Sequence, residues 1–314
     1  MADEEVTREG MAREEDARES MSREEAARES MSREEAARES MTSGEIAQEK
    51  IARAIREKLR EIEERECVKI LYAVESGSRA WGFASPDSDY DVRFIYVRRP
   101  EEYLRLDPKR DVIEWQLDEV FDVNGWDIRK ALIHFHKSST TVFEWSRSPV
   151  VYWESPWWRQ VYEAAEGYFQ VKPALYQYYG VAKSTYSQFL LGETVTYKKY
   201  FYALRPLLAC RYIWEHGCPP PIVFEELMRE ELPGELRQAV RELVERKKKT
   251  LEGDVQTPLP RIQRFIEEEL EIWKARAGEK AGEPKKDWQA LNQVFFRLME
   301  MWRGSYEVIY QRGY

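Results

Sequence analysis

The sequence predicts an α+β domain followed by an all-helical domain, and two observations carry this prediction. Short apolar runs of the kind that form β-strands fill residues 67 to about 125. From about residue 156 the apolar residues recur at helical spacing nearly to the end of the chain. With 314 residues, 43% of them hydrophobic, the chain is long enough to build more than one core. We therefore divide it into residues 1–44, 45–150 and 151–314.

Residues 1–44 carry a ten-residue repeat. MAREEDARES at 11–20 is followed by two copies of MSREEAARES at 21–30 and 31–40. Equivalent positions of such a repeat rotate by roughly 80° around a helix, so no continuous apolar seam forms and a coiled coil is disfavoured. The segment has a net charge of −7, against −2 for the rest of the chain. We expect it to be disordered or a solvated helix, and the functional alternative is an arm that binds an unknown partner.

The cysteines and the hydropathy exclude several classes of protein. Cys67, Cys210 and Cys218 form no C-x-x-C pair, which argues against a disulfide framework. His216 lies near two of them, but the spacing matches no common zinc template. No stretch approaches the roughly 18 apolar residues that cross a bilayer, and the N-terminus lacks the apolar core of a signal peptide. We expect a soluble, cytoplasmic protein with no membrane partner.

The segment 67–97 has the pattern with the most chemical content. The apolar run CVKILYAV predicts a strand and leads into the small-residue turn ESGSRAWG, whose backbone N–H groups are suited to an anion. Twelve positions after Gly77, Asp89 and Asp91 lie at the start of a second apolar run. Side chains two apart on a strand point the same way, so both carboxylates can converge on divalent cations such as Mg²⁺. A solvated acidic turn is the alternative for a lone D-x-D.

The order strand, Gly-Ser turn and D-x-D resembles the signature of the DNA-polymerase-beta nucleotidyltransferase superfamily. Four blocks, GSRAWGFASPDSDYDVRFIY, FDVNGWDIRKAL, EWSRSPVVY and KKYFYALRPLL, more specifically resemble the polymerase-beta-like family associated with predicted RNA repair pathways. The resemblance covers residues 67–215. It implies a palm, a mixed sheet flanked by helices, which transfers a nucleoside monophosphate from a nucleoside triphosphate to an acceptor hydroxyl and releases pyrophosphate.

The acceptor that this resemblance implies is an RNA end. Superfamily cores share their carboxylates, whereas the choice of acceptor lies in the appended region. Transfer to a protein or small-molecule hydroxyl therefore stays open. A catalytically silent nucleotide-binding antitoxin or regulator is the alternative outside enzymes.

The resemblance also assigns the metal site. Asp89 and Asp91, with a third carboxylate from a later strand, are expected to hold two Mg²⁺ ions, with Mn²⁺ as the alternative metal. Asp122 fits the third position because it lies in the strand-like run VFDV, just before a helical run. Asp127 competes with it, but its place after Gly125 is typical of a helix N-cap or a first-turn acid.

Other residues are expected to bind the nucleotide. Lys198 and Lys199 point about 100° apart on a helix, so we expect one of them, Lys199, to face the phosphates. The basic run RKKK at 246–249 is expected on an exposed helix, either solvated or touching RNA phosphates. The residues predicted to contact the nucleotide are Gly77, Ser78, Lys183, Lys199 and Arg205.

Overall fold

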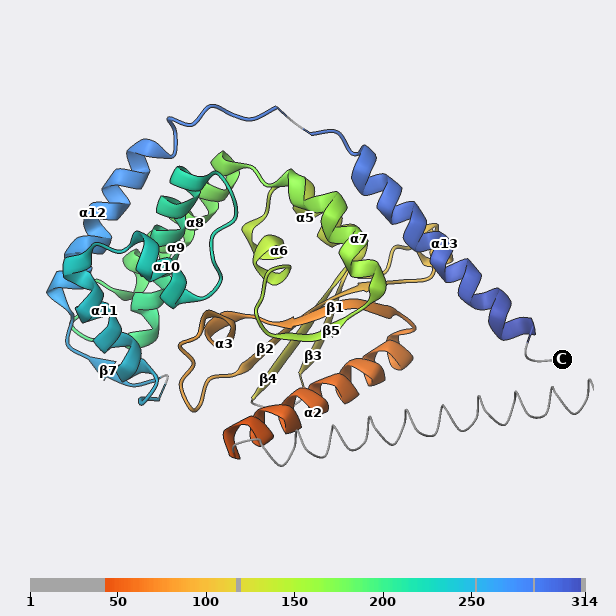
Figure 1. Ribbon diagram of the computed structural model, residues 1–314, viewed down its shortest axis with the longest axis horizontal. Helices are drawn as coiled ribbons and strands as arrows, with labels where there is room; N and C mark the ends of the chain where they lie inside the picture. The colour runs from red at the N-terminus through yellow and green to blue at the C-terminus, as the bar shows by residue number, and fades with distance from the viewer. Residues whose placement is uncertain (1–42, 117–119, 252, 285, 312–314) are drawn as a thin grey trace, which may run out of the picture. The chain divides into compact units, whose positions relative to one another are not determined.

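The computed structural model of the chain describes residues 43–116, 120–251, 253–284 and 286–311 (Figure 1). The ten-residue repeat at 11–40 lies outside these residues, so the disordered segment or solvated helix expected for residues 1–44 falls almost wholly outside the described part of the chain. The chain divides into two units, Met1–Lys58 and Leu59–Tyr314. Helix α2 (Ser43–Glu66) begins in the first unit, and its residues Ile55, Leu59 and Ile62, which recur at helical spacing, are buried. All the other elements in the described part of the chain belong to the second unit.

The strands and helices of the second unit alternate at first and then give way to helices. The strands are β1 (Lys69–Glu75), β2 (Tyr90–Val97), β3 (Val112–Gln116), β4 (Phe121–Asp127), β5 (Val151–Glu154), β6 (Val195–Thr196) and β7 (Val255–Gln256). The helices are α3 (Gly77–Trp81), α4 (Pro100–Tyr103), α5 (Ile128–His136), α6 (Thr140–Trp145), α7 (Pro156–Ala165), the 3₁₀-helix η1 (Glu166–Tyr168), α8 (Val171–Phe189), α9 (Tyr197–His216), α10 (Phe224–Glu231), α11 (Gly234–Lys247), α12 (Pro260–Arg276) and α13 (Gln289–Gln311).

Five strands form one mixed sheet in the order β3-β4-β2-β1-β5. β1 runs antiparallel to β2 and β5, and β3 runs antiparallel to β4, whereas β2 and β4 are parallel. Two parallel strands need a connection that returns the chain to the end of the sheet where the first strand started. The segment with α4 and β3 provides this connection between β2 and β4. The predicted α+β fold, a mixed sheet flanked by helices and followed by a helical region, is confirmed. β5 lies just beyond residue 150, so the sheet includes residues assigned above to the C-terminal region; the division into domains stays a prediction.

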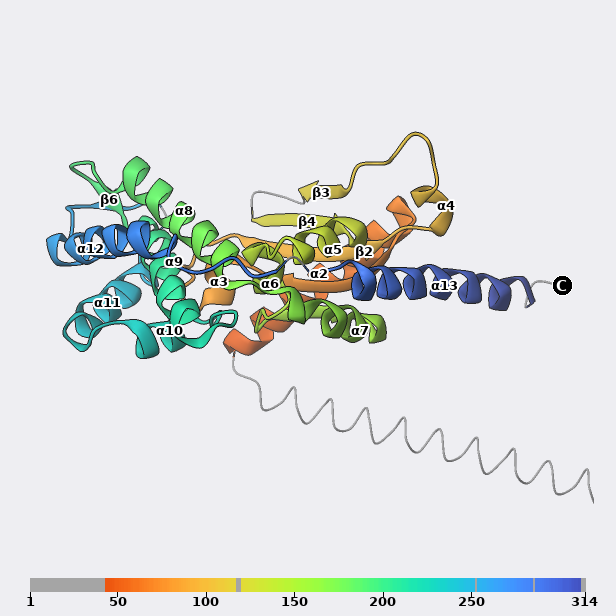
Figure 2. The same ribbon diagram turned by 90° about the horizontal axis from the view of Figure 1, so that it is seen from above.

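Two buried hydrophobic clusters hold the second unit together. The first joins the sheet to α5, α6, α7 and α13, and contains Leu71, Ile95, Phe143, Trp158 and Leu298. Helix α13 therefore packs beside α7, although more than a hundred residues separate them in sequence (Figures 1 and 2). Burying such side chains contributes roughly 1.5–3 kcal/mol for each large residue, so both ends of the second unit's sequence contribute to one core.

The second cluster is built by the helices α8 to α12, where α8 and α9 pack along each other (Figure 2). Phe83, from the loop after α3, inserts its ring into this cluster and stacks on Phe201 of α9. The loop between α3 and β2 is thereby anchored to the helical region. None of the described helices combines the length and apolar character needed to cross a membrane.

Candidate active site

The parallel pairing of β2 and β4 places two of the predicted carboxylates side by side. Asp91 and Asp122 are direct partners in the register of the two strands. Directly paired residues in a sheet point to the same face, so the two side chains share one surface at the start of both strands. The structure thus brings together two aspartates that are 31 positions apart in sequence.

Arg93 links these two carboxylates. Its Nη2 lies 3.0 Å from Asp91 Oδ1 and 2.6 Å from Asp122 Oδ2. Its Nη1 also donates to the backbone carbonyl of Asp122 at 2.9 Å. One guanidinium therefore balances two anions that would otherwise repel each other. Sequence reasoning missed this role, although an arginine two residues after D-x-D, on the same strand face, was the available signal.

The Asp91 carboxyl is the more enclosed of the pair. Its side chain is 29% exposed, against 59% for Asp122. Burial raises the pKa of Asp91 above its ordinary value, Arg93 opposes that shift, and the neighbouring Asp122 adds to it. A bound cation would be favoured by this arrangement, because it would stabilise two carboxylates held close together.

Gly77, in the turn after β1, packs against the side chain of Asp91. Its φ is +62°, in the left-handed region that favours glycine, and a Cβ there would overlap Asp91 Oδ2. Ser76 N also donates to the Asp91 carbonyl at 2.9 Å. The Gly-Ser turn and the D-x-D motif, twelve positions apart, are thus in direct contact, and Ser78 is buried in the short helix α3 that starts at Gly77.

Glu75 accepts a hydrogen bond from the backbone of Asp91. It is buried at the end of β1, where its Oε1 accepts from Asp91 N at 2.8 Å and its Oε2 accepts from Tyr152 Oη at 2.5 Å. Burial raises the pKa of Glu75 to about 7, while the hydrogen bonds from Tyr152 and the Asp91 backbone oppose the shift. Sequence reasoning treated Glu75 as part of a turn; an acid directly following an apolar strand was the signal for its structural role.

Asp89 precedes the strand that carries Asp91, and its charge adds to the rise in the pKa of Asp91. It is exposed on the loop before β2, and Arg79 holds its backbone by donating from Nε to the Asp89 carbonyl at 3.1 Å. Among the described residues, three metal-ligand side chains come within 4.8 Å of one another at Glu215, His216 and Glu231, and not at the three aspartates.

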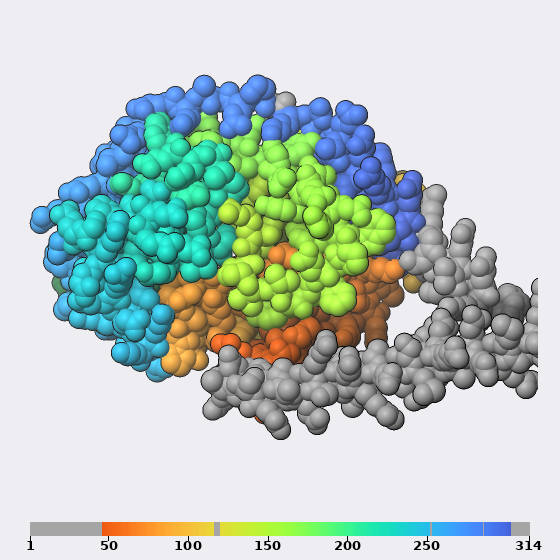
Figure 3. Space-filling model, viewed as in Figure 1, coloured from red at the N-terminus to blue at the C-terminus, as the bar shows by residue number. Residues whose placement is uncertain are grey.

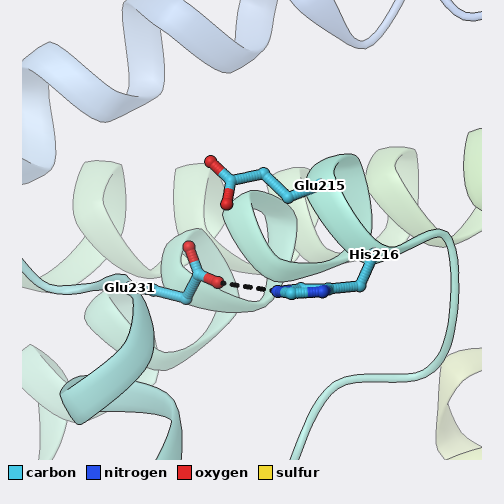
Figure 4. A group of neighbouring side chains, drawn as sticks. All are labelled: Glu215, His216 and Glu231. Carbon is cyan, nitrogen blue, oxygen red and sulfur yellow. Dashed lines mark ion pairs between the residues drawn. The ribbon is translucent and has the colours of Figure 1, made fainter.

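That second group of ligands lies at the end of α9 and on α10 (Figure 4). His216 Nε2 is 3.8 Å from Glu231 Oε1, and Arg211 Nε is 3.7 Å from the other oxygen of the same carboxylate. An arginine therefore supplies positive charge to the buried Glu231. It does not involve the cysteines near His216.

Asp127, the competitor of Asp122, is buried at the other end of β4. It caps α5, since its Oδ1 accepts from Arg129 N at 2.8 Å, and its Oδ2 accepts from Tyr103 Oη at 3.0 Å. The predicted helix N-cap is confirmed. Asp122, and not Asp127, is the register partner of Asp91.

Replacing Asp127 by Asn should flatten part of the pH dependence of stability. Burial raises the pKa of Asp127 from 3.8 to about 6, so the folded state favours the protonated carboxyl. The stability contributed by this group is complete below about pH 4 and is lost as the pH rises through about 6, on the order of 2–3 kcal/mol in all. Asn keeps the cap and does not titrate. Urea unfolding of both proteins between about pH 4 and pH 7 measures the effect, and equal slopes would contradict it.

The cations predicted to bind the nucleotide have different partners in the structure. Lys199 Nζ lies 3.8 Å from the centre of the Phe189 ring, whereas the charge of Lys198 acts on Asp91 and lowers its pKa. The positive charge of Lys198 therefore acts on Asp91, and the choice of Lys199 as the phosphate ligand stays a prediction. Lys183 is exposed on α8, with Nζ 5.9 Å from the Tyr179 ring centre.

Arg205 is only 2% exposed, and its Nη1 pairs with Glu144 Oε1 at 2.8 Å. Its guanidinium also lies 4.5 Å from the ring centre of Trp81, in the helix that begins at Gly77. Arg205 thus has a buried partner and a contact with α3, while its Nε and Nη2 are buried without a hydrogen-bond partner. Its contact with the nucleotide stays a prediction.

The sequence is similar to a known family and to a known protein. Residues 51–297 match the RNA repair pathway DNA polymerase beta family. The chain is 41% identical over 252 residues to the YcgL protein of Bacillus subtilis (strain 168). The aligned residues cover 79% of this chain and 97% of that protein.

A solved structure, the nucleotidyltransferase-like protein from Exiguobacterium sibiricum 255-15, is 12% identical and covers 79% of this chain and 80% of its own, with a TM-score of 0.27. A match at this level adds nothing to the assignment, which rests on the family match and the identity to the Bacillus protein. On these grounds the chain belongs to the RNA repair pathway DNA polymerase beta family.

Proposed function

We propose that the protein transfers a nucleoside monophosphate from a nucleoside triphosphate to an acceptor hydroxyl, with an RNA end as the acceptor. The observation that carries the proposal is the register of β2 and β4, which sets Asp91 beside Asp122 while Gly77 packs against Asp91. Paired carboxylates next to a Gly-Ser turn suit a reaction in which a triphosphate meets a hydroxyl. Membership of the RNA repair pathway family supports RNA as the acceptor.

The carboxylates present fit a divalent cation. Carboxylate oxygens are the ligands that Mg²⁺ and Mn²⁺ take up, and the space between Asp91 and Asp122 already attracts a positive group, the Arg93 guanidinium. Asp91 and Asp122 would hold the metal, with Asp89 completing the set from its loop. When bound, such an ion supplies neutralisation of the triphosphate charge and acidification of the acceptor hydroxyl.

The residues of the chain perform the remaining tasks. The acceptor oxygen forms a bond to the α-phosphorus, the bond from that phosphorus to the oxygen bridging to the β-phosphorus breaks, and pyrophosphate leaves. Asp122, the more exposed carboxylate, takes the proton of the acceptor hydroxyl. Gly77 and Ser78 offer N–H and O–H groups to the phosphate oxygens, and Lys198 offers positive charge to the leaving pyrophosphate.

Label transfer tests the proposal. Nucleotides labelled at the α-phosphate are incubated with Mg²⁺, total RNA and either the parent protein or the double variant Asp89→Asn/Asp91→Asn. Label should appear on RNA with the parent protein and vanish with the double variant. Label on protein would move the acceptor to a protein hydroxyl, and nucleotide binding without transfer to RNA, protein or small hydroxyls would favour a nucleotide-binding regulator.

Replacing each of the two neighbouring lysines by alanine distinguishes their roles. Lys198→Ala should raise the KM for the nucleotide about tenfold or more, because it removes a charge-assisted contact to the phosphates. Lys199→Ala, the matched variant, should change that KM by less than about threefold, since its ammonium lies over Phe189. Steady-state kinetics of both variants decide the point, and a larger effect at Lys199 would restore the choice made from the sequence.

A further inference from the structure

Lys247, the second residue of the basic run at 246–249, is not on the exposed surface that the sequence suggested. It is the last residue of α11 and is 0% exposed, whereas its neighbour Lys248 has a side chain that is 43% exposed and pairs with Glu245. A lysine is almost never buried completely unless its ammonium has specific partners. Its contacts therefore indicate what it does.

Lys247 Nζ donates to Ser85 Oγ at 2.6 Å, across 162 positions of sequence. Ser85 is buried in the loop SPDS that leads into the D-x-D motif, and its Oγ lies 2.9 Å from Ser88 Oγ. On the face shown in Figure 3, the cyan and blue helical region adjoins the orange segment to which this loop belongs. The chain of hydroxyls thus runs from α11 to the residue immediately before Asp89.

The same loop is closed by its own hydrogen bonds. Ser88 N donates to the Ser85 carbonyl at 3.1 Å, and Ser85 N donates to Ser88 Oγ at 3.0 Å. Arg79 also holds this loop, since its Nη2 donates to the Ser88 carbonyl at 2.5 Å. Asp89 is exposed and follows directly, so its position depends on these supports of residues 85–88.

We propose that Lys247 is a positioning residue that holds the loop 85–88 and thereby sets the place of Asp89. This inference rests on the proposed function for what Asp89 does, but the contact that carries it is independent of that function. Through Lys247 the helical region reaches the metal-binding motif of the sheet, and α11 takes part in organising a site to which it contributes no ligand. Partners outside the ligand set of a metal typically change affinity or activity by about 10- to 100-fold when they are lost.

Hydrogen–deuterium exchange of the protein without metal or nucleotide tests the contact itself. The variants are Lys247→Met, which keeps an apolar stem of similar length, Ser85→Ala, and Lys248→Met as the matched control. Peptides covering residues 84–92 should exchange at least about tenfold faster in the first two variants, and at the parental rate in the control. Unchanged exchange in both would overturn the proposal. If Lys247→Met speeds exchange everywhere because it unfolds the protein, the smaller Ser85→Ala change decides.

The second measurement is the Mg²⁺ requirement of nucleotidyl transfer. Lys247→Met and Ser85→Ala should each raise the half-saturating Mg²⁺ concentration about 10- to 100-fold while the KM for the nucleotide changes by less than about threefold. The double variant should be less impaired than the sum of the two single variants, since Lys247 and Ser85 share a hydrogen bond. Additive effects, or a parental Mg²⁺ requirement, would overturn the proposal. If the parent transfers nothing to any acceptor, the proposed function fails, and the exchange experiment still decides the role of Lys247.

Discussion

Replacing Asp91 by Asn is expected to lower the rate of nucleotidyl transfer by about 10³-fold or more. Asp91 is the carboxylate on which the site converges, because Gly77 packs against it, Glu75 holds its backbone and Arg93 joins it to Asp122. The change removes one negative charge and one ligand oxygen while keeping the shape of the side chain. Charge placed for the transition state is worth several kcal/mol, so its loss should appear in kcat.

The control for this change is Asp107→Asn. Asp107 is exposed in a loop, where it pairs with Arg105, and no described contact connects it to the site. It should transfer label at the parental rate. Nucleotide binding, measured by titration calorimetry, should survive in Asp91→Asn even though transfer is lost. A variant at Asp91 that keeps more than about a tenth of the parental rate would be incompatible with the proposed role of Asp91 as a metal ligand.

Gly77→Ala should have the second largest effect, since it meets two obstacles at once. The φ of +62° costs a residue with a Cβ roughly 1–2 kcal/mol, and the new methyl group would overlap Asp91 Oδ2. The clash can be relieved by moving the Asp91 carboxylate away from Asp122, or by shifting the turn that precedes α3. Either movement should reduce transfer by about 10²-fold or more, because a displacement of about 1 Å in a catalytic group has effects of that size.

Gly180→Ala is the matched control for this substitution. Gly180 lies within α8 and has nothing within 4 Å of the position that a Cβ would take. Alanine there should stabilise the protein by about 0.5–1 kcal/mol, and transfer should be unchanged. Thermal unfolding and label transfer on both variants give the comparison. Full activity in Gly77→Ala would show that the turn and Asp91 do not have to meet.

The sequence was informative wherever the signal was local. The strands around Cys67 and Tyr90 could be predicted from apolar runs, and the cap at Asp127 from its place after Gly125 before a helical run. The proximity of Asp91 and Asp122 could be expected from the family resemblance, although the parallel register that creates it is a property of the sheet. Pattern reasoning works here because each signal lies within about ten residues.

What could not be predicted depends on contacts between distant segments. The contact of Lys199 with Phe189 depends on how α9 is rotated against α8, which a single helical wheel leaves undetermined. The ion pair of Arg205 with Glu144 joins residues 61 positions apart, so no local pattern could indicate it. Lys247 was indistinguishable from its basic neighbours, because only the fold brings α11 to Ser85.

The packing of α13 beside α7 also constrains how the protein is made. Leu291, Val294, Leu298 and Trp302 complete the cluster that covers the sheet. A ribosome delivers these residues long after strands β1 to β5 have emerged. Until they arrive, the nascent sheet and helices lack one apolar wall of their core, and the exposed surface is a site for chaperones or for aggregation. The sheet is therefore translated early but can finish folding only after α13 has been synthesised.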